Sequence, residues 1–179
     1  KSGAIVNSEY EPVNAGIYDS ETISYIDTGE ILVMILKSPF QVVVFRSTDY
    51  SLVMVDIPGA TGWDTDNGYI FSSKFGLENE HFFGLGLAGG AVDRKGRFIT
   101  QFNTDYGAYG EFTMPLYTSF PFYYGITNGA SYGVFFDNPA KPFFDMGSSN
   151  PNVTSFGAFA GELDYYLMTG PKPADVAAA

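Results

Sequence analysis

The stretch Glu80-His-Phe-Phe-Gly-Leu-Gly86 opens the part of this chain that decides its fold, which continues to Pro173. Short segments rich in Phe, Tyr, Val and Ile recur along it, and Gly, Pro, Asn or Asp separates them. Aromatic and β-branched residues favour strands, and turns spaced roughly eight to twelve residues apart are typical of a β-sandwich. The sequence therefore predicts an all-β fold, an antiparallel β-sandwich.

Strands are also expected upstream and downstream of this motif. Asp66-Asn-Gly68 and Asn128-Gly129 predict hairpin turns, because Gly or Asn supplies the positive φ that such turns need. Residues 174–179 favour a helix in composition, but six residues are too few to hold a helix alone. The expected strands are residues 31–36, 41–45, 52–55, 69–75, 96–102, 120–126, 132–136, 143–146, 155–159 and 163–168.

Composition limits the possible functions. The chain has 179 residues, of which 45% are apolar and 16% charged, so it is long and apolar enough for one domain with a buried core. Its net charge of −11 argues against binding to nucleic acid or to an anionic membrane surface. It has no cysteine, which excludes disulfides and thiol chemistry without identifying a compartment.

Three local patterns resemble functional motifs without their required context. Gly84-Leu-Gly86-Leu-Ala-Gly89 matches a dinucleotide fingerprint, but no helical periodicity follows it. Asp64-Thr-Asp66-Asn-Gly68 begins like a calcium loop, yet its twelfth position is Phe75, so an Asx turn is expected instead. His81 is the only histidine and is expected at the start of a strand. We therefore expect no metal and no cofactor.

Paired carboxylates are a further candidate for chemistry. Glu162 and Asp164 would point to one face if they alternate along a strand, and two carboxylates suffice for glycoside hydrolysis. A structural role in that strand is the favoured interpretation.

Six motifs occur in one order and together resemble a known domain. They resemble the N-terminal β-sandwich of glycoside hydrolase family 31, the α-glucosidase and α-xylosidase family, over roughly residues 29–176. The motifs are Glu80-His-Phe-Phe-Gly-Leu-Gly86, Phe102-Asn-Thr-Asp105, Pro115-Leu-Tyr-Thr-Ser-Phe-Pro121, Tyr132-Gly-Val-Phe-Phe-Asp-Asn138, Gly161-Glu-Leu-Asp-Tyr-Tyr166 and Gly170-Pro-Lys-Pro173.

The resemblance implies a supersandwich of the galactose-mutarotase type and a division of the chain. Residues 1–28 would form a loop or edge segment of the same domain, and residues 29–173 the family sandwich. Residues 174–179 would begin the connection to a catalytic (β/α)8 barrel that is absent from this chain. The partners implied are that barrel and an α-glucoside oligosaccharide, and no catalytic residue is expected in this chain.

Asp105 is the residue to which the resemblance gives a role. It implies that the loop of Asp105 reaches over the open face of the barrel, and that the carboxylate hydrogen-bonds sugar hydroxyls. Phe102, Tyr106 and Tyr109 are the other expected substrate contacts, the two tyrosines because they lie among glycines in a loop. The residues alone would favour an Asp that caps its own turn before Gly107.

Two positions depart from the family pattern. Phe102 stands where the family usually has Trp, and Leu87 stands where it usually has Glu. Either change is compatible with altered specificity or with a divergent branch.

The function implied is a non-catalytic domain of a retaining α-glycosidase, inactive alone. Alternatives are a free-standing carbohydrate-binding module, a structural domain whose partner is another protein, and a domain of a family 31 α-glucosyltransferase or α-xylosidase.

Overall fold

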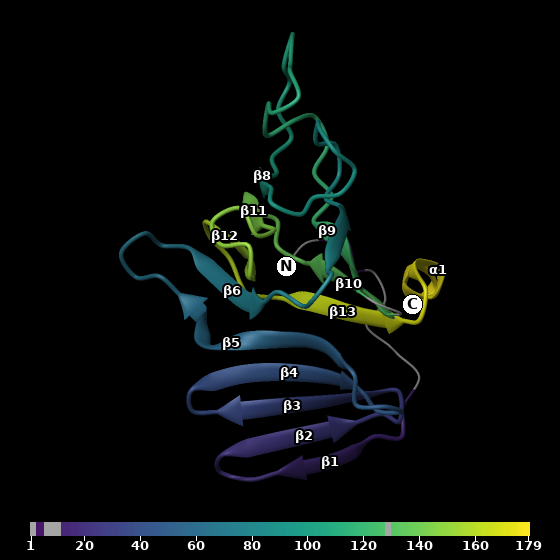
Figure 1. The fold of residues 1–179 in the computed structure, drawn as a ribbon. Helices are drawn as coiled ribbons and strands as arrows, with labels where there is room; N and C mark the ends of the chain where they lie inside the picture. The colour runs from purple at the N-terminus through teal and green to yellow at the C-terminus, as the bar shows by residue number, and fades with distance from the viewer. Residues whose placement is uncertain (1–2, 6–11, 128–129) are drawn as a thin grey trace.

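The computed structural model describes residues 3–5, 12–127 and 130–179, and within them the chain is an antiparallel β-sandwich (Figure 1). All strand pairs are antiparallel, and they form two sheets, which confirms the predicted fold class. The large sheet contains, in order, β1 (Gly16–Asp19), β2 (Ile23–Asp27), β3 (Ile31–Lys37), β4 (Phe40–Arg46), β5 (Leu52–Trp63), β6 (Ile70–Phe75), β12 (Val153–Ala158), β11 (Pro142–Asp145) and β8 (Phe98–Thr100). The small sheet contains β13 (Tyr165–Gly170), β10 (Ala130–Phe136), β9 (Phe122–Thr127) and β7 (His81–Gly84).

An aromatic core joins the two sheets. Tyr123 of β9 lies edge-on to Phe82 of β7 and to Phe144 of β11, with ring centroids 5.9 and 6.2 Å apart. Such edge-to-face pairs add stability beyond the area they bury. Gly125 of β9 leaves room for the ring of Tyr132, because a Cβ there would lie 2.1 Å from Cζ of that ring. The core side chains that are at most 2% exposed include Val44, Phe82, Leu85, Ile99, Tyr123, Val134, Phe136, Phe144, Met146 and Phe156.

Glu80 is buried beside this core, at the start of the first family motif. Its Oε1 accepts a hydrogen bond of 2.6 Å from the hydroxyl of Tyr132, and its Oε2 accepts one of 2.9 Å from the backbone N–H of Leu77. Burial raises the pKa of Glu80, and these two hydrogen bonds oppose the rise.

A buried ion pair links β5 to β6. Nζ of Lys74 lies 2.6 Å from Oδ1 of Asp56, and both side chains are at most 3% exposed. The ammonium also lies 5.1 Å from the ring centroids of Phe156 and Tyr165. Burial lowers the pKa of Lys74, and the charge of Asp56 opposes this. The pair lies where the register between the strands shifts, between Asp56 and Thr61, so it fixes the irregular part of β5.

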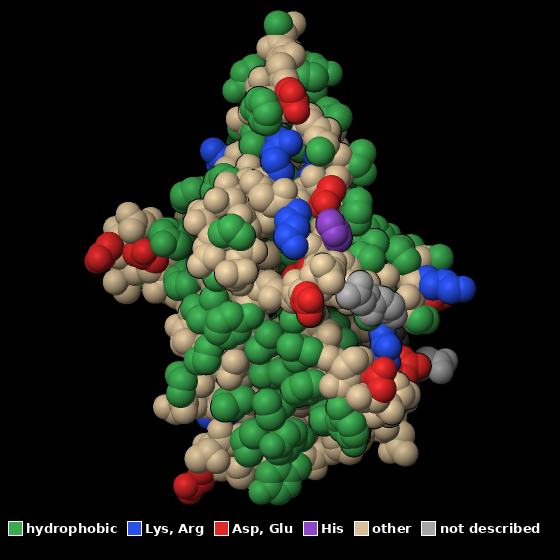
Figure 2. Space-filling model, viewed as in Figure 1, with side chains coloured by type: hydrophobic (Ala, Val, Ile, Leu, Met, Phe, Trp, Pro, Cys, Tyr) green, Lys and Arg blue, Asp and Glu red, His purple; other side chains and the backbone are tan. Residues whose placement is uncertain are grey.

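The first four strands extend beyond the small sheet and form a wing, defined here as β1 to β4 (Figure 1). Side chains along β2 and β3 are half-buried at successive positions, so both faces are partly open. Ile17 and Tyr18 of β1 are 74% and 57% exposed. Figure 2 shows hydrophobic side chains gathered over this part of the large sheet.

Several elements differ from the sequence-based expectation. No strand was expected within residues 1–28, which were predicted to form a loop or edge segment, but their described part contains β1 and β2 at the edge of the large sheet. The strand expected at residues 52–55 continues to Trp63. The predicted turn Asn128-Gly129 lies outside the described residues, although β9 and β10 flank it.

A short helix, α1 (Pro173–Ala178), follows β13, so the expectation of no helix is wrong here. Pro173 occupies the first turn, where its missing N–H costs nothing. Asp175 accepts a 3.0 Å hydrogen bond from the backbone N–H of Lys172. Val176 is 1% exposed and lies against Gly133 of β10, so tertiary packing stabilises a helix too short to form alone. Within the described residues, no helix is long and apolar enough to cross a membrane.

Candidate functional site

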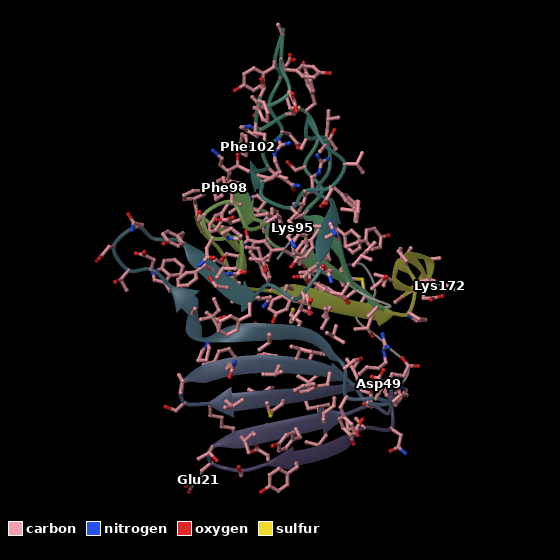
Figure 3. The ribbon with its side chains drawn as sticks, viewed as in Figure 1. Glu21, Asp49, Lys95, Phe98, Phe102 and Lys172 are labelled. Atoms are coloured by element: carbon pink, nitrogen blue, oxygen red, sulfur yellow. The ribbon has the colours of Figure 1, made fainter. Side chains whose placement is uncertain are left out.

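A long loop, called here the finger (residues 101–121), leaves the sandwich between β8 and β9. It has no helix or strand, and it projects from one end of the molecule (Figure 1). Phe102 marks its foot in Figure 3. Binding residues often lie on loops that a rigid scaffold positions, and the finger fits this description.

Hydrogen bonds between the two halves of the finger hold its base in place. Oδ1 of Asn103 accepts a 2.8 Å hydrogen bond from the backbone N–H of Ser119, and the N–H of Thr104 donates to the carbonyl of Leu116 at 3.1 Å. Both hydrogen bonds join the outgoing and returning halves of the loop. The backbone on the N-terminal side of Asp105 is therefore held in place.

A second set of contacts lies on the C-terminal side of Asp105. The hydroxyl of Tyr117 donates a hydrogen bond to the carbonyl of Tyr106. The ring of Tyr109 meets the same Tyr117 edge-on, with ring centroids 5.8 Å apart. Asp105 thus lies between two anchored neighbours.

The carboxylate of Asp105 is exposed, and no described residue hydrogen-bonds or ion-pairs with it. It does not cap the turn before Gly107, which was the alternative that the residues alone favoured. A free carboxylate on an anchored backbone is available to accept hydrogen bonds from a ligand.

The four expected contact residues all lie on the finger. Phe102 is 57% exposed, Tyr106 36% and Tyr109 56%. Phe112, which is 70% exposed on the same loop, was not among the contacts expected from the sequence. Its position two residues after Gly110 in a loop was the signal that could have identified it, since a similar argument selected the two tyrosines.

The glycines of the first motif pack directly against the returning half of the finger. Gly84 and Gly86 have φ of 113° and 64°, and a Cβ on Gly86 would lie 3.1 Å from the carbonyl oxygen of Thr118 in the finger. Arg94 holds the segment by donating to the carbonyls of Gly84 and Ala91 at 3.2 and 2.8 Å. A loop follows β7 where a dinucleotide site needs a helix, so these glycines serve close backbone packing.

His81 begins β7, as predicted, and its side chain is 51% exposed. Its Nδ1 lies 2.6 Å from Oδ2 of Asp93. Partial burial opposes ionisation of Asp93, but hydrogen bonds from the N–H of Lys95 and from His81 outweigh it, so the pKa of Asp93 is lowered. The pair connects β7 to the turn that carries Arg94.

The other acidic candidates have structural positions. Oδ1 of Asp64 accepts hydrogen bonds from the N–H groups of Asp66 and Asn67, each 2.9 Å, which confirms the predicted Asx turn. Glu162 and Asp164 precede β13, so their predicted alternation along a strand is wrong. Among the described residues, no group of acidic or histidine side chains is placed to hold a metal ion.

Comparison with known proteins agrees with the fold and the motifs. The chain is 33% identical over 172 residues to α-glucosidase 2 of Bacillus thermoamyloliquefaciens, covering 96% of this chain and 22% of the relative. It is 27% identical to α-xylosidase XylQ of Lactiplantibacillus pentosus, over 88% of this chain and 20% of the relative.

A solved structure of a glycoside hydrolase family 31 dextranase from Flavobacterium johnsoniae superposes with a TM-score of 0.79. It is 32% identical, and the match covers 90% of this chain and 19% of the dextranase. The chain thus spans about a fifth of the length of these relatives. The family model of the glycosyl hydrolase 31 N-terminal galactose mutarotase-like domain matches residues 2–145, and the chain belongs to this family.

Proposed function

We propose that this chain is the non-catalytic N-terminal domain of a retaining α-glycosidase that acts on α-glucosides, and that its finger contributes Asp105 to the substrate pocket. The observation that carries the proposal is that the carboxylate of Asp105 is exposed and makes no hydrogen bond to a described residue. Hydrogen bonds between the two halves of the loop hold its backbone in place. A carboxylate accepts two charge-assisted hydrogen bonds, so it suits the adjacent hydroxyls of a sugar ring.

Asp105 would bind and orient the substrate without reacting. In the two-carboxylate scheme of retaining glycosidases, one acid protonates the leaving oxygen and a second carboxylate attacks the anomeric carbon. Both would come from the catalytic barrel, where residues at the ends of several strands perform the chemistry. Hydrogen bonds from the sugar to Asp105 would hold the ring in the geometry that this attack needs.

The wing supports packing against a further part of the polypeptide. A gathering of exposed apolar side chains can mark an interaction site, and Figure 2 shows such a gathering on one face of the wing. The edge strand β1 also exposes Ile17 and Tyr18. The partner proposed is the catalytic barrel. Glucosides are proposed over xylosides because the α-glucosidase and the dextranase share more identity with this chain than the α-xylosidase does.

The test compares the isolated chain with the intact protein on maltose and isomaltose. The isolated chain is expected to be inactive, and the intact protein to release glucose first as the α-anomer, which NMR detects before mutarotation. Hydrolysis by the isolated chain, or release of the β-anomer by the intact protein, would contradict the proposal.

A second candidate is a carbohydrate-binding module. The exposed rings of Tyr109 and Phe112 favour it, since the flat faces of aromatic side chains can stack on sugar rings. Binding of isomaltose that Tyr109→Ala abolishes in the isolated chain would support this function.

A further inference from the structure

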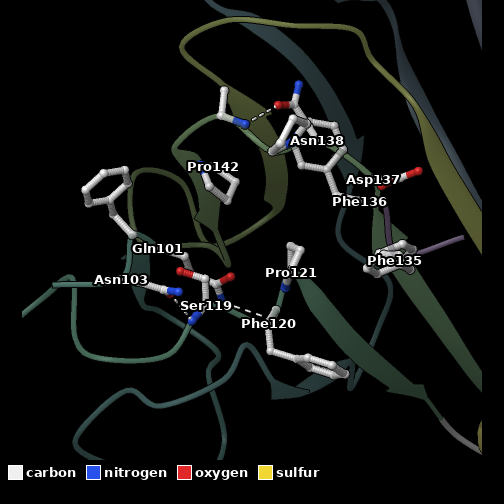
Figure 4. Close-up of a pocket in the computed structure, with 14 residues that line it drawn as sticks. Gln101, Asn103, Ser119, Phe120, Pro121, Phe135, Phe136, Asp137, Asn138 and Pro142 are labelled. Atoms are coloured by element: carbon white, nitrogen blue, oxygen red, sulfur yellow. Dashed lines mark hydrogen bonds between the residues drawn. The ribbon is translucent and has the colours of Figure 1, made fainter. Parts of the chain in front are cut away.

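A pocket of about 420 Å³ lies at the foot of the finger, next to the end of β10 and the turn that follows it (Figure 4). Phe102, Phe120, Phe135 and Phe136 are among the residues that line it. Its volume falls within the range of about 300–1,000 Å³ that is typical of small-molecule sites. Asp105 is not among the described residues that line it, although Phe102, another expected substrate contact, is.

Gln101 brings an unpaired polar atom to this pocket. Its side chain is 4% exposed, and its Nε2 donates to the carbonyl of Phe120 at 3.1 Å, as Figure 4 shows. Its Oε1 is buried and accepts no hydrogen bond from the described residues. A buried acceptor left in this state destabilises the fold, so native proteins usually provide a partner. A hydroxyl donor brought by a ligand would supply it.

Two further polar groups line the pocket. Oδ1 of Asn103 is occupied by the N–H of Ser119, which leaves the amide NH2 of Asn103 without a bond to a described residue. The hydroxyl of Ser119 likewise makes no hydrogen bond within the described part of the chain. The pocket therefore combines an amide acceptor, an amide donor and a hydroxyl with four phenylalanine residues.

The charge of the lining selects a neutral ligand. No Lys, Arg or His is among the described lining residues, so a phosphate or carboxylate would find no counter-charge. Asp137 is the one acidic lining residue among them, and it is 5% exposed and already engaged. A neutral ring with apolar C–H faces and several hydroxyls matches this arrangement.

We propose that this pocket binds one neutral hexopyranose unit, with Oε1 of Gln101 accepting a hydroxyl hydrogen bond and Phe102 and Phe120 packing against the C–H face of the ring. The site lies on this chain alone, apart from Asp105. The choice of glucose among the hexoses rests on the proposed function. Since the pocket offers few polar partners, the affinity is expected in the millimolar range, about −4 kcal/mol.

The test is a titration of the 179-residue chain with methyl α-D-glucopyranoside and isomaltose. NMR of the side-chain amide groups of Gln101 and Asn103 should show saturable shifts. Phe102→Ala is expected to raise the Kd about tenfold, and because this ring is exposed the fold should persist. Gln101→Met keeps the volume, removes the acceptor and should have a similar effect.

Two matched variants separate this site from the other sugar contacts. Tyr109→Ala removes an exposed ring of the finger that does not line the pocket, and Asp105→Ala removes the carboxylate. Both should leave the Kd within about twofold of the original, well under 1 kcal/mol. Binding lost in Tyr109→Ala, or retained unchanged in Phe102→Ala, would overturn the proposal. So would the absence of saturable shifts up to roughly 100 mM, well above the expected Kd.

The two proposals can fail separately. If the pocket does not bind sugar while Asp105→Ala reduces the activity of the intact protein, only the pocket proposal is wrong. If sugar binds in the pocket while Asp105→Ala has no effect on activity, the pocket proposal is supported and the proposed substrate-binding role of Asp105 is wrong.

Discussion

Asn103 reaches across the foot of the finger and accepts a 2.8 Å hydrogen bond from the backbone N–H of Ser119, sixteen residues further along the chain. In the Asn-Thr-Asp motif, the Asn side-chain oxygen is therefore committed to the fold of the loop, while the carboxylate of Asp105 stays open. The motif therefore combines an anchoring side chain at Asn103 with an open carboxylate at Asp105.

Asn103→Ala should loosen the finger, whereas Asn103→Asp should not, because a carboxylate oxygen can accept the same hydrogen bond. The alanine variant is expected to lose about 1 kcal/mol of unfolding free energy. Amide hydrogen exchange at Ser119 measures the effect directly and should accelerate in the alanine variant only. Equal protection of Ser119 in both variants would show that the contact does not hold the loop.

The Asp56–Lys74 pair predicts an asymmetric response to substitution. Removing one partner, as in Asp56→Ala, leaves a buried uncompensated charge and should cost about 3–5 kcal/mol. Replacing both, as in Asp56→Leu with Lys74→Met, should recover most of this loss. Urea unfolding of the two single variants and the double variant tests the prediction. Additive losses in the double variant would contradict it.

The raised pKa of Glu80 should make its contribution to folding stability decrease as pH rises. Burial raises its pKa in the folded state above the value in the unfolded chain. Its contribution is therefore fully present below the unfolded pKa of about 4.3 and is lost as pH rises through the folded pKa. Carboxyl groups whose pKa is lowered in the folded state, such as that of Asp93, add stability as pH rises. A comparison of variants is therefore needed to isolate the effect of Glu80.

Glu80→Gln removes this titration and isolates it. The stability of the original chain relative to Glu80→Gln should be greatest near pH 4 and should decline toward neutral pH, about 1.4 kcal/mol for each pKa unit of the rise. Urea unfolding across this range measures the difference. A difference that is independent of pH would contradict the raised pKa.

The wing predicts self-association of the isolated chain. Ile17→Lys and Tyr18→Lys place charges on the exposed edge strand, a position where charge opposes edge-to-edge pairing. Sedimentation velocity should show less association in these variants. Val92→Lys is the matched control, since Val92 is equally exposed but lies outside the wing. Equal association in all variants would show that the wing does not mediate self-association.

The strands β3 and β4 were predictable because their residues carry a continuous apolar pattern. The strands β1 and β2 were not, since β1 is exposed throughout and so lacks that pattern. Helix α1 depends on the packing of Val176 against Gly133, a contact between residues far apart in sequence. Local composition cannot encode such a contact.

The candidate site was likewise predictable only in part. Glycines around Tyr106 and Tyr109 indicated an exposed loop, and the structure places both residues there. The bond from Ser119 to Asn103 and the unpaired Oε1 of Gln101 arise only when the two halves of the finger meet. No spacing in the sequence predicts either one.

The most direct test of the central claim is kcat/KM of the intact protein for isomaltose with Asp105→Asn and Asp105→Ala. Hydrogen bonds to a charged group contribute about 1.5–3 kcal/mol, so a loss of roughly 10- to 150-fold is predicted. Asp66→Asn, an exposed Asp in the β5–β6 hairpin, is the control and should leave kcat/KM unchanged. If Asp105→Ala also leaves kcat/KM within about twofold, under 0.5 kcal/mol, the finger does not contact the substrate and the account is contradicted.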